Sequence, residues 1–216
     1  QFDLQPDKVA QPLAELCKAD PSCSAALGPD PWAKLQAIKA KFGTGHCAEL
    51  GLTYADRAKF TPLLQLWSLR AYALAAYARF DRCTPADVTA LRTMLSKLSV
   101  FAGGVASPLL YFNVAFAELW ETPPPSRATL QARADQAVFP AGDLTDQLDI
   151  YQVWPKAPVD PLARKYPTTS VPILMMNGDL DMQTPIDTAS LVKSHYTAPN
   201  QTFVTIPNAN HAVVIQ

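Results

Sequence analysis

The stretch Val171-Pro-Ile-Leu-Met-Met-Asn-Gly-Asp-Leu-Asp181 decides the fold of this 216-residue chain. It begins with an apolar run that is long enough for a buried strand and too short for a helix of ordinary length. The rest of the stretch predicts a turn. The sequence Thr184-Pro-Ile-Asp187 is typical of a helix start, with Thr184 as N-cap and a proline in the first turn. We therefore expect a strand, a turn and a helix that runs to about His195.

A second strand and a histidine loop complete this unit. Residues 201–206 alternate polar and apolar side chains and are rich in β-branched residues, which predicts a strand. A loop that contains His211 follows. Because two parallel strands joined by a helix have their carboxyl ends at one edge of the sheet, Asp181 and His211 should lie close together. A carboxylate can orient a histidine ring while the other ring nitrogen accepts a hydroxyl proton, so the pair is predicted to be two members of a catalytic triad.

The same residues carry a resemblance to a known family. The run from Val171 to Pro185, followed by a helix, a strand and Asn210-His211, resembles the C-terminal segment of secreted α/β-hydrolases related to tripeptidyl and prolyl aminopeptidases, the TAP-like serine peptidases. The resemblance implies Asp181 as the triad acid and His211 as the triad base. Asn210 stands where that family prefers glycine, which is a mild change because asparagine tolerates the left-handed backbone region.

Each member of the pair also has a plain structural interpretation. An aspartate in a Gly-Asp-Leu-Asp turn is often only a turn former, and a histidine in an Asn-rich loop is often only solvated. Asp179 is the rival acid, although it lies nearer the strand end and does not match the spacing of the family. The joint pattern of strands, helix and both side chains favours the catalytic interpretation for Asp181 and His211.

The nucleophile of such an enzyme is expected outside these residues. It normally lies in a Gly-x-Ser-x-Gly turn between a strand and a helix, and no such pentapeptide occurs in the sequence. The nearest glycine–serine cluster, residues 103–107, has the wrong spacing and indicates a loop. The chain begins with Gln1 rather than Met and ends at Gln216, soon after the histidine. We therefore expect a piece of a longer protein whose serine nucleophile and N-terminal half lie upstream.

The predicted fold class is α/β, as a fragment of an α/β-hydrolase with a mostly parallel sheet. Residues 1–106 predict helices separated by proline and glycine, with helix starts at Asp30-Pro31 and at Thr84-Pro85-Ala86-Asp87 and with residues 53–80 as the most helical stretch. The resemblance implies that these helices form a helical cap, or lid, over the active site. Residues 107–216 would be the C-terminal part of the hydrolase core. Within it, residues 108–116 predict a return strand, and residues 137–170 predict a long irregular segment. Glu118, after that strand, is a candidate for binding a substrate amino group, or else a surface carboxylate.

The composition excludes some classes of binding partner and indicates the cellular compartment in which the protein folds. A net charge of −1 without a basic stripe argues against nucleic acid, and the longest apolar stretch is too short and too broken to span a membrane. Four cysteines predict two disulfides and an oxidising compartment, secreted or periplasmic, with free thiols as the alternative. Their spacing argues against a zinc site, and we expect neither a metal nor another cofactor. The preferred pairing among the three possible is Cys17 with Cys23 and Cys47 with Cys83.

The sequence therefore predicts the cap and C-terminal catalytic half of a serine hydrolase that releases residues from peptide N-termini. Its expected partners are a peptide substrate and the missing N-terminal half of the same protein, and the segment alone should be inactive. Two alternatives stay open. One is a non-catalytic hydrolase-like module that binds a peptide or a partner, and the other is an esterase with the same triad.

Overall fold

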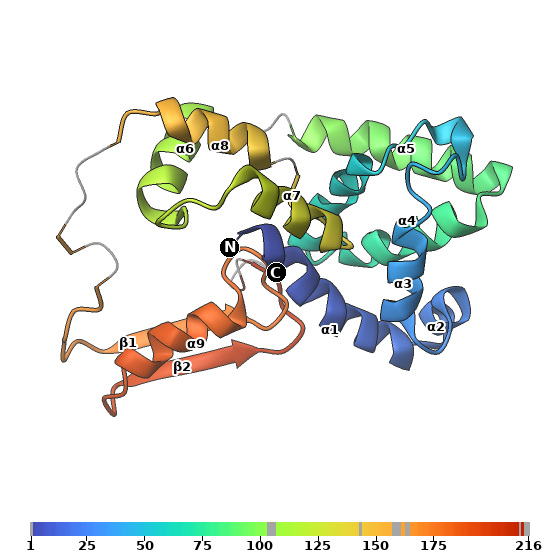
Figure 1. The fold of residues 1–216 in the computed structure, drawn as a ribbon. Coiled ribbons are helices and arrows are strands. Elements are labelled where there is room, and N and C mark those ends of the chain that lie inside the picture. The colour runs from blue at the N-terminus through green and yellow to red at the C-terminus, as the bar shows by residue number, and fades with distance from the viewer. Residues whose placement is uncertain are drawn as a thin grey trace.

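The computed structural model describes residues 2–102, 107–142, 144–156, 161–162, 165–211 and 213. They form a larger helical group, a smaller helical group and a strand–helix–strand unit (Figure 1). Most of the described residues are helical, and the two strands among them are short and parallel, which places the chain in the mixed α/β class. Among these residues, no helix combines the length and apolar character that a bilayer span needs.

The larger helical group contains most of the first hundred residues. Its elements are the 3-10 helices η1 (Phe2–Leu4), η2 (Ala48–Leu50) and η3 (Ala55–Gln65) and the α-helices α1 (Gln5–Ala19), α2 (Pro21–Leu27), α3 (Pro31–Lys39), α4 (Arg70–Arg82) and α5 (Pro85–Ala102). Helix α3 begins as predicted, because the Asp30 side chain accepts a hydrogen bond from the Ala33 amide at 3.0 Å. Residues 53–80, predicted to be the most helical stretch, instead divide into η3, an irregular link and α4.

An aromatic core fills this group and includes residues from much later in the chain. Phe42 stacks on Phe80 with ring centroids 4.0 Å apart, and Tyr77 packs against both Phe42 and Phe139. The backbone amides of Val138 and Phe139 each donate to the Asp7 carboxylate at 2.8 Å. Burial raises the pKa of Asp7 above its ordinary value, and these two amide bonds oppose that rise. The chain after residue 137 is therefore tied into the helical core.

Two disulfides staple the larger group, in the preferred pairing. Cys17–Cys23 joins α1 to α2, and Cys47–Cys83 joins the residue before η2 to the end of α4. The described chain has no free cysteine. Two disulfides are compatible with an oxidising compartment outside the cytosol.

The start of α5 is an ion-paired cap around Asp87. Its side chain is 4% exposed and accepts from Arg82 at 2.7 Å and from Arg79 at 3.0 Å. It also exchanges hydrogen bonds with Thr84, so the predicted helix start at Thr84-Pro-Ala-Asp87 is confirmed. The hydrogen bond from Arg82, ahead of the others, lowers the pKa of Asp87 to about 2.

The smaller helical group corrects two predictions. Its elements are α6 (Pro108–Val114), the π-helix η4 (Ala115–Leu119), α7 (Arg127–Gln136) and α8 (Leu144–Val153). The return strand predicted at residues 108–116 is wrong, and residues 144–153 of the supposed irregular segment are helix. The reason is a helical repeat of large rings: Phe112, Phe116 and Trp120 follow one another at intervals of four. They pack against Tyr151 and Trp154 of the neighbouring segment to form a separate core.

The strand–helix–strand unit follows the predicted order of elements. Strand β1 (Ile173–Gly178) pairs in parallel with β2 (Gln201–Ile206), from Ile173 opposite Gln201 to Gly178 opposite Ile206. Helix α9 (Ile186–His195) connects them, and it begins after Pro185, so Thr184 is not its N-cap.

One face of the β1–β2 sheet is covered and the other is open. Lys193 of α9 lies over the Phe203 ring at 5.5 Å, so α9 covers the face that carries Phe203. Leu174 and Met176 alternate to the opposite face, where they are 66% and 40% exposed. The sheet therefore presents apolar side chains on its uncovered face.

Candidate acid–base site

The parallel pairing of β1 and β2 brings Asp181 and His211 together. Both residues follow the carboxyl ends of their strands, and these ends meet at one edge of the sheet. The Nδ1 atom of His211 lies 2.9 Å from Oδ2 of Asp181, within hydrogen-bond distance. The structure thus places the two predicted residues in direct contact, 30 positions apart in sequence.

The Asp181 carboxylate is fixed by several donors. The residue is 3% exposed, and its Oδ1 atom accepts from the backbone amides of Gln183 at 2.8 Å and Thr184 at 2.9 Å. Its Oδ2 atom accepts from the Thr184 hydroxyl at 2.6 Å, beside the contact with His211. Because only one of these partners is the histidine, the orientation of the carboxylate does not depend on the ring that it contacts.

The contact with Asp181 also selects a tautomer of His211. A carboxylate accepts hydrogen bonds, so Nδ1 carries the proton and the lone pair of the neutral ring lies on Nε2. The side chain is 40% exposed, so the ring is not enclosed by the described residues. An imidazole held in this way can accept a proton at Nε2 while the buried carboxylate stabilises the resulting cation.

The turn after β1 and the loop after β2 fit closely against each other. A Cβ atom on Gly178 would lie 2.1 Å from the Ala209 carbonyl oxygen, so only glycine permits this approach. Asp179 accepts from the Asn208 amide at 2.6 Å, and the Leu180 amide donates to the Ala209 carbonyl at 3.0 Å. The rival acid Asp179 therefore fastens the loop, while Asp181 contacts the histidine.

Asn210 anchors the histidine loop to the larger helical group. Its side chain is fully buried, donates to the Leu64 carbonyl at 2.6 Å and accepts from Arg70 at 2.7 Å. Arg70 also donates to the Asn208 carbonyl, and burial lowers the pKa of Arg70 while Asp179 opposes that shift. Asn208, not Asn210, has the positive φ, at 57°.

A hollow of about 650 Å³ lies between α1 and the strand tips. Its lining includes Trp32 and Leu16, together with the carboxylates of Glu15 and Asp179. Nearby, Lys8 of α1 forms an ion pair with Asp187 of α9, and this hydrogen bond lowers the pKa of Asp187. The hollow therefore combines apolar side chains with the acidic residues Glu15 and Asp179, and Asp179 belongs to the same turn as Asp181.

Glu118 is not placed where the sequence suggested. The strand that would have delivered it to the sheet edge is a helix, and Glu118 lies exposed on η4 in the smaller helical group. Its role in binding a substrate stays a prediction without a strand tip to support it. In the described part of the chain, no cluster of three or more His, Cys, Asp or Glu side chains could hold a metal ion.

No protein-family model, curated protein or solved structure matches this chain. The residues and geometry of the site are therefore the basis for inferring its function.

Proposed function

We propose that this chain provides the acid, the base and the helical cover of a secreted serine hydrolase that removes residues from peptide N-termini. The observation that carries the proposal is the 2.9 Å contact between buried Asp181 and half-exposed His211 at the tips of two parallel strands. The resemblance of residues 171–211 to TAP-like serine peptidases supports the same assignment. The two disulfides fit secretion.

In this proposal the nucleophile is a serine from another part of the full-length protein. His211 Nε2 takes the proton of the serine hydroxyl as its oxygen attacks the peptide carbonyl, and Asp181 stabilises the imidazolium. The imidazolium then gives this proton to the leaving amine as the carbon–nitrogen bond breaks, which leaves an acyl-enzyme. A water molecule repeats the sequence, with His211 again the base, and releases the free acid and the serine.

The uncovered face of the β1–β2 sheet supports the proposal that this chain is part of a longer protein. Parallel sheets are normally covered on both faces, yet Leu174 and Met176 are exposed on a sheet of two described strands. An upstream segment that packs helices against this face would bury both side chains. The same segment would bring its serine to the edge where Asp181 and His211 lie.

Acidic groups near the strand tips support specificity for a free amino terminus. Glu15 and Asp179 line the hollow beside α1, where a peptide ammonium group would gain charge-assisted contacts. Leu16 and Trp32 would contact an apolar side chain of the same peptide. A blocked N-terminus lacks the positive charge that these carboxylates favour.

Kinetics of the full-length protein test the proposal. We expect His211→Ala to lower kcat/KM for free peptides by about 10⁴-fold or more, because loss of the base removes the proton transfer. His195→Ala is the matched control, since His195 lies exposed on α9 and stacks on Tyr166. Peptides with an acetylated N-terminus should react poorly.

The rival functions predict different results. An esterase would hydrolyse simple esters but not the peptide bonds of free peptides, and N-terminal blocking would not change its rate. A non-catalytic binding module would show no turnover that depends on His211. Either result would refute the proposed peptidase.

A further inference from the structure

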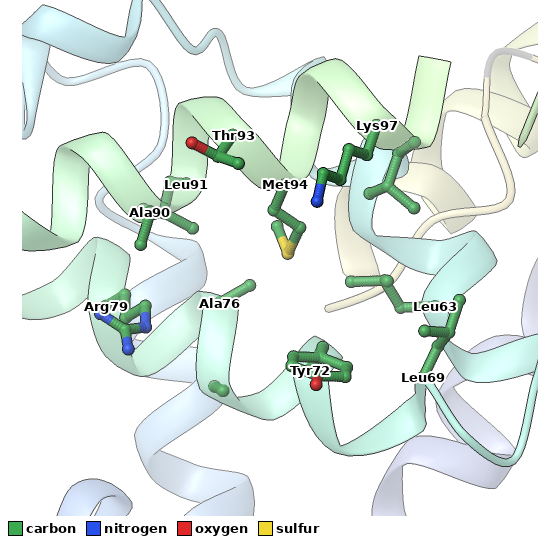
Figure 2. A pocket seen from close by; sticks show the side chains of 12 residues that line it. Leu63, Leu69, Tyr72, Ala76, Arg79, Ala90, Leu91, Thr93, Met94 and Lys97 are labelled. Carbon is green, nitrogen blue, oxygen red and sulfur yellow. The ribbon is translucent and has the colours of Figure 1, made fainter. Parts of the chain in front are cut away.

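A groove of about 550 Å³ runs between α4 and α5 in the larger helical group (Figure 2). Residues on one stripe of α4 form its first wall: Tyr72, Ala75, Ala76 and Arg79. Residues on one stripe of α5 form its second wall: Ala90, Met94, Lys97 and Leu98. We call this feature the α4–α5 groove. Its volume is in the range of small-molecule sites, about 300–1,000 Å³.

The groove exists because small side chains leave space between two helices. Near the turn that joins α4 to α5, Phe80, Val88 and Leu91 are buried and close the hairpin. Further along, alanines on both helices leave the space unfilled. Close packing is the rule in protein interiors, so an apolar hollow of this size leaves favourable contacts unmade. Met94 lies at the centre of the view in Figure 2, and its flexible thioether can adapt to an occupant.

The charged side chains that line the groove are cationic. The described residues that line it include no carboxylate, and among them the cationic side chains of Arg79 and Lys97 lie toward opposite ends (Figure 2). Arg79 is paired with Asp87 at 3.0 Å. Lys97 forms no ion pair with any residue that the structure describes, and its amine is directed toward the groove (Figure 2). An apolar groove with one uncompensated ammonium group is complementary to an apolar anion.

We propose that the α4–α5 groove binds a fatty acid, with its alkyl chain along Leu63 and Met94 and its carboxylate at Lys97 Nζ. An alkyl chain needs no hydrogen-bond partner, which suits walls made mostly of alanine, leucine and methionine. A peptide would instead bring amide groups against helices whose own backbone groups are already paired, at a cost of about 1–3 kcal/mol for each unpaired group. The proposal does not depend on catalysis by Asp181 and His211.

Calorimetric titration of the full-length protein with short amphiphiles below their micelle concentrations tests this site. Dodecanoate should bind, and each methylene added along a series from octanoate should lower Kd about fourfold until the groove is full. Dodecanol should bind more weakly, and dodecyltrimethylammonium more weakly still. These three probes share the chain and differ in the charge that faces Lys97.

Variants separate the charge from the apolar wall. Lys97→Met should weaken dodecanoate binding about three- to fivefold and leave dodecanol binding unchanged. Ala75→Leu fills the groove without breaking α4 and should weaken both ligands. Lys18→Met is the matched control, because Lys18 lies on α1 outside the groove and should change neither. Circular dichroism verifies that each variant is folded.

Several results would overturn the proposal. If dodecanoate and dodecanol bound with equal affinity, or if wild type and Lys97→Met bound dodecanoate equally well, a contact between the carboxylate and Lys97 would be excluded. Failure of the full-length protein to bind any of the probes would identify the groove as an internal packing surface. Binding to phosphatidylcholine vesicles that contain phosphatidylglycerol, without binding of free dodecanoate, would assign the groove to a membrane surface instead.

Discussion

Replacing Asn210 by alanine should loosen the histidine loop and destabilise the protein. The side chain is fully buried and forms hydrogen bonds with the larger helical group, as donor to the Leu64 carbonyl and as acceptor from Arg70. A neutral hydrogen bond contributes about 0.5–1.5 kcal/mol and one to a charged group about 1.5–3 kcal/mol. Arg70 keeps its contact with the Asn208 carbonyl, so we take the lower part of the second range. The expected loss in the free energy of unfolding is about 2–3 kcal/mol.

Urea unfolding followed by circular dichroism measures this loss at constant m-value. Asn210→Asp separates the two contacts, since a carboxylate keeps the acceptor for Arg70 but faces the Leu64 carbonyl without a donor. Asn208→Gly is the matched control, because glycine accepts the positive φ of that exposed position. A loss below about 0.5 kcal/mol for Asn210→Ala, similar to a surface substitution, would refute the anchoring role.

Two further predictions concern the stability of the larger helical group. The pKa of Asp87 is about 2 in place of 3.8, and after discounting for its exposed arginine partners Asp87→Asn should cost about 1–2 kcal/mol at pH 7. Because the folded-state pKa is the lower one, this loss should be full above pH 3.8 and should disappear as the pH falls toward 2, in pH-dependent urea titrations; a pH-independent loss would contradict it. Replacing both Cys47 and Cys83 by serine removes a disulfide between residues 36 positions apart and should lower the free energy of unfolding by about 4 kcal/mol. The same replacement of Cys17 and Cys23, which are 6 positions apart, should lower it by about 2 kcal/mol. Thermal unfolding of the two double-serine variants measures the difference, and the reverse order would refute the loop-length argument.

The sequence predicts the secondary structure correctly where that structure depends on residues close in sequence. The starts of α3 and α5 follow from Asp-Pro and Thr-Pro signals, and the order of β1, α9 and β2 follows from short apolar runs and turn residues. The strand predicted at residues 108–116 is wrong because an apolar aromatic run suits a strand as well as a buried helix. The spacing of Phe112, Phe116 and Trp120 was the signal for a helix, and their burial in one core explains why the helix forms.

The candidate site was predictable only in part for the same reason. Asp181 and His211 each follow a recognisable strand, so their meeting could be inferred from the topology of a parallel pair. The contact of Asn210 with Arg70 joins positions 140 residues apart and depends on how the helical group packs against the loop. Thr184 looked like a helix cap, yet its hydroxyl donates to Asp181, because α9 begins after Pro185.

The central claim is that His211, held by Asp181, activates a serine in the full-length protein. The most direct measurement is the rate of covalent labelling of that protein by a fluorophosphonate, which reacts with activated serines. The account predicts that His211→Ala lowers this rate by about 10⁴-fold, while His195→Ala leaves it unchanged. Equal labelling of wild type and His211→Ala, or no labelling of the wild type, would contradict it.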